Sequence, residues 1–176
     1  QTCALPILRY DVASASVSDD EGRTGLSSSD LALGMTVEVT GTAVAAAAAT
    51  AAEVRVASAL VGPVTQAPDG GCSCLYVMGQ PVRYGGTTVI PSGLLVGDVV
   101  EVHAQPDWAA GPWVGTRVDR MTDTSRAYKT VAWVQGGAAL DASAHTVSVF
   151  SVGNPPGGSA SATVLTYDDS TVVQAL

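Results

Sequence analysis

The chain has 176 residues, of which 47% are hydrophobic and 14% charged, and its formal net charge is −8. Binding to phosphate groups requires clustered lysine and arginine. Because Lys129 is the only lysine, nucleic acid and anionic membranes are poor candidate partners, whereas a cation, a neutral sugar or a protein surface remains open. No run of about 18 apolar residues, the length that a transmembrane helix needs, occurs in this sequence.

The first seven residues do not read as part of a folded domain. One back-translation of QTCALPI (1–7), CAG ACG TGT GCT CTT CCG ATC, resembles a sequencing-library adaptor read in frame, and no initiator methionine precedes it. We interpret residues 1–7 as an artefact to be left out of fold reasoning; a natural N-terminal segment is the alternative. On the first interpretation the true N-terminus is missing, with any signal peptide or lipid anchor, and Cys3 has no structural role.

Similar segments recur along the rest of the chain in the same order. LALGMTVEVTG at 31–41 aligns with LLVGDVVEVHA at 94–104, so that Gly34 pairs with Gly97. LVGPVT at 60–65 resembles TVAWVQ in the last third of the chain, and each is followed by a turn and an apolar segment. A third motif combines a Tyr, a turn-prone pair and Ser or Thr before Val or Ile, and it occurs at 9–17, 83–90 and 166–173.

This order predicts tandem repeats. Residues 8–59 would be a partial first repeat that lacks its opening hairpin, 60–128 a complete repeat, and 129–176 a partial third repeat that stops after its Tyr segment. Chance similarity within a Val- and Thr-rich chain is the alternative.

The repeated segments have the period of β-strands. Val100 and Val102 fall on one face of a strand and Glu101 and His103 on the other, while Val99 indicates partial cover on that second face. Turn residues separate strands of five to seven residues about every ten positions, which is typical of sandwiches and barrels. The Ala-rich run 43–52 is read as an extended hairpin because an isolated helix of that length is marginal, although its composition also permits a helix.

These residues resemble a bacterial repeat family, the domain of unknown function 5666. The resemblance rests on the L-x-x-G-D-x-V-E-V pattern from Leu94 to Val102, on the V-x-G-x-V strand from Val61, and on LYVMGQPV at 75–82. The third repeat departs from the family at Ala132 and Trp133, where the family tends to have Gly. The resemblance implies an all-β fold of tandem small OB-like β-barrels with truncated terminal repeats, in exported or envelope-anchored proteins, with no established catalytic residues.

Three residues are weak candidates for a metal site. Cys72 and Cys74, at i and i+2, would share one face of a strand. Met78 and His103 are the nearest further residues of suitable chemistry for a soft metal. Four ligands at zinc-type spacing are absent, and a disulfide across so short a loop would tend to be strained. A turn cysteine beside a buried cysteine is therefore the plainer interpretation, and no cofactor is expected.

Three aromatic residues are weak candidates for binding. Trp108 and Trp113 flank a Gly-Pro turn, which favours exposure, and Tyr76 and Trp133 are further large aromatics. Exposed rings on a barrel face would stack on a sugar or a protein partner, but a chain with one Phe also needs its aromatics for packing. Core packing is the preferred alternative.

Other catalytic and ionic signals are faint. His103 and His145 lack a partner motif such as a nucleophile elbow, and the acidic stretches 19–21 and 168–169 do not match an EF-hand loop, which leaves only a weak calcium alternative. We therefore expect a non-enzymatic structural or binding module of an exported bacterial envelope protein, with an unknown protein or glycan surface as its partner. The alternatives are an OB-fold domain that binds oligonucleotides or oligosaccharides and a metal-assisted enzyme.

Overall fold

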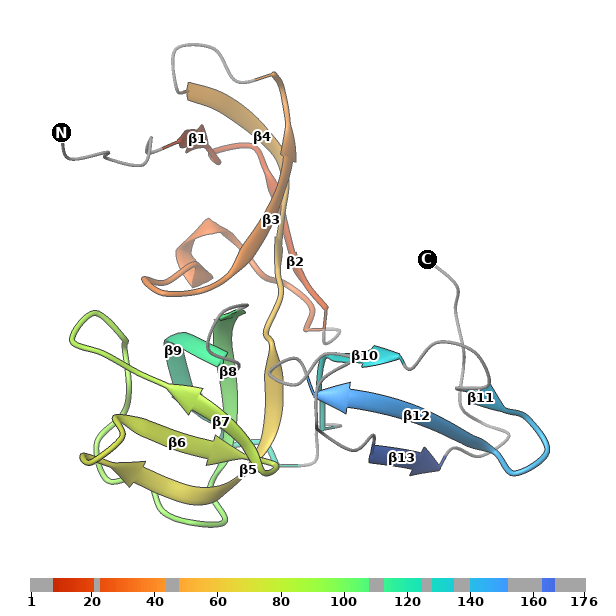
Figure 1. Cartoon of the computed structure of the whole chain (residues 1–176). Helices are drawn as coiled ribbons and strands as arrows, with labels where there is room; N and C mark the ends of the chain where they lie inside the picture. The colour runs from red at the N-terminus through yellow and green to blue at the C-terminus, as the bar shows by residue number, and fades with distance from the viewer. Residues whose placement is uncertain are drawn as a thin grey trace, which may run out of the picture.

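The computed structural model describes residues 8–20, 23–43, 48–107, 113–124, 128–134, 140–151 and 163–166. Over these residues the chain is all-β, with one 3-10 turn at Ser28–Asp30, so the predicted fold class is confirmed. Residues 1–7, Trp108 and Tyr167 lie outside the described residues. Figure 1 shows a barrel with one sheet standing above it and a second sheet beside it.

The middle of the chain forms a closed five-stranded barrel. Its strands follow the order β5-β6-β7-β9-β8, and β8 pairs back with β5. All neighbouring strands are antiparallel except β7 and β9, which are parallel. The bounds are β5 Leu60–Asp69, β6 Cys74–Val77, β7 Gln80–Arg83, β8 Val99–Pro106 and β9 Trp113–Arg120.

Alternation along each strand fills the barrel with aliphatic side chains. Val100, Val102 and Ala104 point inward from β8, as the period of two predicts. Full burial of one such valine contributes about 1.5–3 kcal/mol to folding. The remaining buried members of this core come from all five strands and the segments between them: Ala59, Leu60, Val64, Leu75, Val77, Val82, Leu94, Trp113 and Val118.

The N-terminal sheet is built around one long strand, β4 Ala48–Val56. β3 (Val37–Gly41) pairs antiparallel with one edge of β4. β1 (Arg9–Asp11) and β2 (Ser16–Asp19) follow each other along the other edge, and both are parallel to β4. Part of the Ala-rich run is therefore strand, as expected from residue 48 onward, whereas residues 44–47 of that run lie outside the described residues.

The C-terminal sheet is antiparallel and has β12 at its centre. β10 and β11 lie along one edge of β12 and β13 along the other. Every described residue of β13 is exposed. The bounds are β10 Ala132–Val134, β11 Leu140–Asp141, β12 Thr146–Ser151 and β13 Thr163–Thr166.

The hairpin β3–β4 has the same geometry as the hairpin β8–β9. Each begins with a turn closed by a hydrogen bond between residues three apart, at 32–35 and at 95–98. The third residue of each turn is a glycine with positive φ, +87° at Gly34 and +95° at Gly97, a conformation that a side chain disfavours.

The pairing registers of these two hairpins also agree. Val37 lies opposite Val56 in the first, and Val100 lies opposite Arg120 in the second. In both hairpins a bulge follows three residues further along the first strand. The aligned segments therefore adopt one local structure twice.

Candidate functional site

Two of the aromatic candidates, Tyr76 and Trp113, lie on strands of the barrel. Tyr76 is half-buried on β6, next to β7. Trp113 begins β9 and is only 4% exposed, and its indole N–H donates a hydrogen bond to Oε1 of Gln80 at 3.1 Å. Trp113 is thus a packed core residue, the alternative that the sequence left open, and the expectation of exposure beside the Gly-Pro turn is wrong for this residue.

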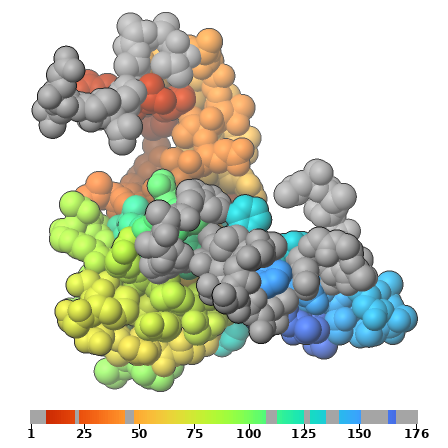
Figure 2. Space-filling view, viewed as in Figure 1, coloured from red at the N-terminus to blue at the C-terminus, as the bar shows by residue number. Residues whose placement is uncertain are grey.

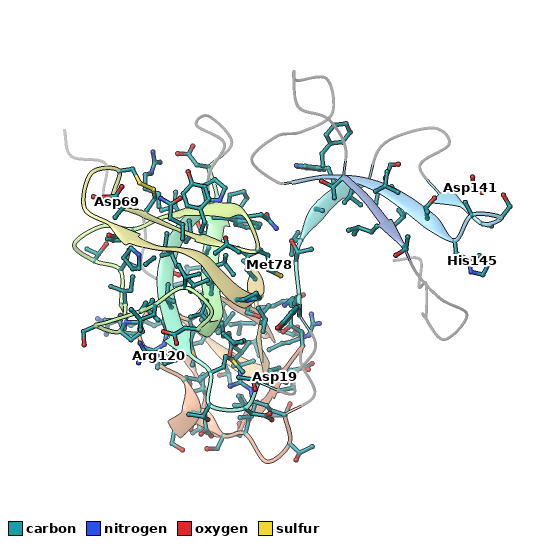
Figure 3. The ribbon with its side chains drawn as sticks, turned by 90° about the horizontal axis from the view of Figure 1, so that it is seen from below. Asp19, Asp69, Met78, Arg120, Asp141 and His145 are labelled. Atoms are coloured by element: carbon teal, nitrogen blue, oxygen red, sulfur yellow. A yellow bond between two sulfur atoms is a disulfide. The ribbon has the colours of Figure 1, made fainter. Side chains whose placement is uncertain are left out.

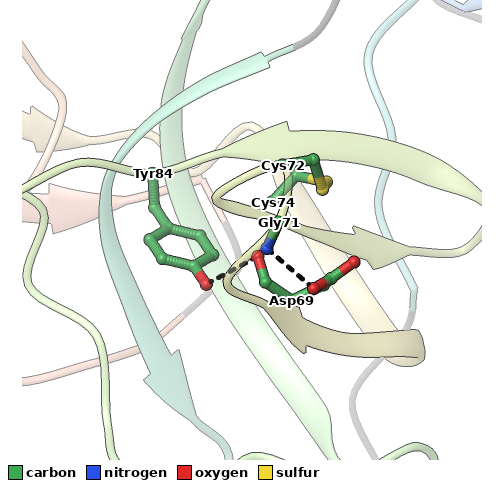
Figure 4. Close-up of a disulfide and its surroundings, with 5 residues drawn as sticks. All are labelled: Asp69, Gly71, Cys72, Cys74 and Tyr84. Atoms are coloured by element: carbon green, nitrogen blue, oxygen red, sulfur yellow. Dashed lines mark hydrogen bonds between the residues drawn. A yellow bond between two sulfur atoms is a disulfide. The ribbon is translucent and has the colours of Figure 1, made fainter.

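The turn between β5 and β6 is closed by a disulfide. Cys72 and Cys74 are bonded to each other, with their Cα atoms 5.2 Å apart. A carboxylate oxygen of Asp69 accepts a hydrogen bond from the backbone N–H of Gly71 at 2.8 Å, and the Tyr84 hydroxyl donates to the Asp69 carbonyl at 3.3 Å (Figure 4). The tip of this hairpin is therefore fixed by a covalent bond and by hydrogen bonds to the neighbouring strand.

The candidate metal ligands are not gathered by the fold. The sulfur atoms of Cys72 and Cys74 are bonded to each other, and His103 lies on β8. Within the described part of the chain, no group of three or more His, Cys, Asp and Glu side chains is placed to hold a metal ion. His145 lies beyond the barrel, at the outer end of the C-terminal sheet near Asp141 (Figure 3).

His103 is buried rather than exposed on the outer face of its strand. Its side chain has 0% exposure because the N-terminal sheet covers that face of the barrel. The backbone N–H of Thr36 donates to Nδ1 of His103 at 3.3 Å. Nδ1 therefore accepts this bond, while Nε2 has no hydrogen-bond partner among the described residues and lies 3.6 Å from Oε1 of Glu101.

Burial sets the protonation of this pair. Desolvation lowers the pKa of His103 below 6.5, and desolvation raises the pKa of Glu101 above its usual value even though Arg23 opposes it. Nη2 of Arg23 lies 3.3 Å from Oε1 of Glu101, and Nε of Arg23 pairs with the buried carboxylate of Asp19. The junction between sheet and barrel is therefore a buried polar cluster that favours a neutral imidazole.

Further polar contacts extend this junction. The Thr116 hydroxyl donates to the Gly34 carbonyl at 2.7 Å, and Arg117 donates to the Leu33 carbonyl at 3.0 Å. These bonds join the turn before β3 to β9 of the barrel. The sequence pattern predicted partial cover of this barrel face at Val99, but nothing in it identified the segment that provides the cover.

Lys129 ties the segment after the barrel to the same junction. Its backbone N–H and carbonyl both bond with Val61, at 2.8 and 2.9 Å. Its ammonium group donates to the Asp20 carboxylate and to the Ser58 carbonyl. Asp20, one of the acids considered for calcium, is thus engaged in an ion pair with the only lysine of the chain.

A pocket of about 470 Å³ opens where the three sheets meet. Two indoles, Trp113 and Trp133, contribute to a wall that is otherwise mostly aliphatic. Sequence inspection did not identify this pocket, because its wall combines separate segments. Its other lining residues are Thr36, Ala57, Ser58, Ala59, Ala104, Gln105, Pro106, Val131 and Ala132.

Comparison with known proteins gives one family match. A family described as Domain of unknown function (DUF5666) matches residues 61–119, which span the barrel, so the resemblance seen in the sequence is confirmed over that segment. No curated protein matches the chain. No solved structure matches it either. Among the described residues no helix is long and apolar enough to cross a membrane.

Proposed function

Because a DUF5666 family model matches residues 61–119, we propose that the barrel and the sheets joined to it form a non-catalytic structural module of an exported bacterial envelope protein. The observation that carries this proposal is the buried polar junction. Thr36, Gly34 and Leu33 of the N-terminal segment are hydrogen-bonded to the barrel, and Arg23 pairs with the buried Glu101. Such contacts favour a fixed angle between neighbouring units rather than a flexible linkage.

The shared geometry of the two hairpins supports a serial arrangement of such units. β3–β4 and β8–β9 have the same turn, register and bulge. Repeated units in which each contacts its neighbour give extended, stiff proteins whose stability includes the interfaces between units. The module would therefore act as a spacer or scaffold that holds adjoining parts at a set distance.

The disulfide supports export. Disulfides form and persist in oxidising compartments and are rare in the cytosol of most organisms. The Cys72–Cys74 bond closes the tip of an exposed hairpin. Thiol titration of the unfolded protein, produced with and without a periplasmic leader, tests this part: periplasmic material is expected to show one free thiol, from Cys3, and three free thiols would contradict it.

A pair of arginine variants tests the structural role. Arg23→Ala removes the guanidinium partner of the buried Glu101, whereas Arg55→Ala removes a more exposed ion pair with Glu38 on the same sheet. We expect Arg23→Ala to destabilise the chain by about 1–3 kcal/mol, less than for a fully buried pair because this guanidinium is partly exposed. Arg55→Ala should cost at most about 1 kcal/mol.

The readouts separate stiffness from simple stability. Small-angle scattering of Arg23→Ala should show a broader distribution of dimensions, and proteolysis should accelerate between residues 23 and 36. Equal behaviour of Arg23→Ala and Arg55→Ala in both measurements would contradict a structural role for the junction.

Oligosaccharide binding is a second candidate function. The strand order, first-second-third-fifth-fourth with a parallel third–fifth pair, supports an OB-like barrel, a fold that binds ligands on its second and third strands and on two flanking loops. Tyr76 lies on the second strand and the Cys72–Cys74 turn precedes it. The net charge of −8 favours a neutral sugar over an oligonucleotide.

Ligand titrations decide this second candidate. Neutral glycans should perturb the Tyr76 resonances. Tyr76→Ala should weaken binding by about fivefold or more, on the scale of the about 1–3 kcal/mol that one nucleobase stacked on an aromatic side chain contributes. Binding of single-stranded DNA at low salt would instead favour an oligonucleotide ligand, and silence in both titrations would leave the structural role alone.

A further inference from the structure

The C-terminal sheet reproduces the first three strands of the barrel. β10, β12 and β13 pair in the same antiparallel order as β5, β6 and β7. The registers also agree, because Val134 lies opposite Val149 as Val64 lies opposite Val77. This sheet therefore corresponds to the opening half of a barrel.

The N-terminal sheet reproduces the closing half. β3 and β4 match β8 and β9 in register, and β1 is parallel to β4 as β7 is parallel to β9. In the barrel the two halves meet where β8 pairs with β5. Among the pairings that the structure describes, β3 pairs only with β4 and β10 only with β12, so the corresponding edges of the two sheets do not meet within one chain.

Both sheets expose valines that the barrel buries. Val37 is 45% exposed, Val131 44% and Val134 62%. Figure 2 shows residues of the β3–β4 sheet, in orange, on the outer surface of the molecule. The valines at the corresponding barrel positions are each exposed by 1% or less: Val100, Val61 and Val64. Each sheet thus exposes apolar positions that the barrel covers with its other half.

We propose that β10 of one copy of this chain pairs antiparallel with β3 of a second copy, so that the two half-barrels join head to tail. The barrel supplies the register. In the barrel Gly62 lies opposite Val100. Ala132 aligns with Gly62 and Val37 with Val100, so Ala132 lies opposite Val37 across the proposed contact. The neighbouring pair brings Val131 opposite Glu38. This contact is heterologous, so successive copies add to a growing chain or close into a ring.

A second copy fits this role better than the β10 of the same chain. In the proposed register Thr130 lies opposite Val39, farther along β3 from the barrel than Thr36, which contacts His103. Lys129 is held against the barrel by two backbone bonds with Val61 and by its ammonium contacts. Pairing of β3 with its own β10 would break all of these bonds, whereas pairing with another molecule leaves them intact.

The first test is the mass of the full chain in solution. Sedimentation velocity from low micromolar to submillimolar concentration is expected to show species that grow beyond the 17.7 kDa monomer as the concentration rises. A chain that remains at 17.7 kDa over the whole range overturns the proposal.

Site-directed cross-linking then tests the register and the occupant. In a Cys3→Ser background, which leaves only the native disulfide, Val37→Cys and Ala132→Cys proteins are oxidised separately and as a mixture. The mixture should give several-fold more covalent dimer than either protein alone, because facing residues of antiparallel strands lie within disulfide distance. A mixture of Glu38→Cys with Ala132→Cys is the matched control, since one residue of offset moves the thiol to the other face.

Two outcomes of the cross-linking would overturn the proposal. A mixture that yields no more dimer than the single variants would exclude a head-to-tail contact. Alternatively, a protein carrying both Val37→Cys and Ala132→Cys would close into a cross-linked monomer, which would show that β10 of the same chain occupies the edge of β3.

Discussion

Two glycines in equivalent turns allow the junction between sheet and barrel to be perturbed with an internal control. Gly34 and Gly97 both have positive φ, so alanine at either position introduces the same backbone strain, about 1–2 kcal/mol. A Cβ at Gly97 would meet nothing within 4 Å. A Cβ at Gly34 would lie 2.5 Å from the Thr116 carbonyl oxygen and 3.0 Å from Cβ of Arg117, so the sheet and the barrel must move apart.

That movement has a calculable cost. It weakens the hydrogen bond from the Thr116 hydroxyl to the Gly34 carbonyl and the bond from Arg117 to the Leu33 carbonyl, each of which contributes about 0.5–1.5 kcal/mol. Gly34→Ala should therefore destabilise the junction by about 2–4 kcal/mol, against about 1–2 kcal/mol for Gly97→Ala.

Amide hydrogen exchange is the appropriate assay, because the N–H of Thr36 donates across the junction to His103. Every 1.4 kcal/mol of local stability corresponds to about tenfold in exchange rate. Exchange at Thr36 should be at least about fivefold faster in Gly34→Ala than in Gly97→Ala, because the weakened hydrogen bonds add about 1 kcal/mol or more. Equal exchange rates at Thr36 in the two variants would show that only backbone strain, and no contact with the barrel, operates at Gly34.

Three further predictions concern the barrel. Because the pKa of His103 is lowered below 6.5 in the folded state, the stability that depends on its neutral form is present above that pH and is lost as the pH falls. Between about pH 7 and about pH 5, the unfolding free energy measured in urea should therefore fall more for the natural chain than for His103→Gln, while the opposing effect of Glu101 is common to both. Equal losses in the two proteins would contradict the lowered pKa of His103. Leu75→Ala, at a fully buried core position, should cost about 2–5 kcal/mol in urea unfolding, and a cost below about 1 kcal/mol would be inconsistent with the packed barrel. Reduction of Cys72–Cys74 should lower the unfolding free energy by about 1–2 kcal/mol, since the loop it closes is short, and an unchanged thermal midpoint in dithiothreitol would exclude that contribution.

Local patterns were sufficient to predict much of the secondary structure. Val100 and Val102 alternate with polar residues, and both point into the barrel as a period of two requires. Gly34 and Gly97 align in sequence and share the same turn conformation. The reading of the Ala-rich run as extended agrees with β4, which begins at Ala48. These features depend on neighbouring residues, which a single sequence shows directly.

Burial across segments could not be predicted in the same way. His103 lies on the outer face of β8, as its position in the pattern indicates, but it is buried because Thr36, 67 residues earlier in the chain, packs over it. Trp113 follows a turn motif that favours exposure, yet it completes the barrel core. Such long-range cover depends on how sheets assemble, and no local signal at either residue reports it.

The spacing of Cys72 and Cys74 alone does not decide whether they form a disulfide, because that depends on their geometry. Cys72 and Cys74 were compatible with a disulfide, with free thiols or with part of a soft metal site. In the structure they are joined, at a tip where Asp69 and Tyr84 fix the backbone around them. The nearest sequence signal was the pair of glycines before Cys72, which marks a tight turn.

We infer that the N-terminal sheet and the barrel form one rigid unit through the buried cluster around His103. ¹⁵N relaxation of the full chain measures this directly, because it reports the rotational correlation time of each amide. One common correlation time is expected for the strands of residues 9–56 and of residues 60–120. Two distinct correlation times, with the sheet tumbling faster than the barrel, would contradict it.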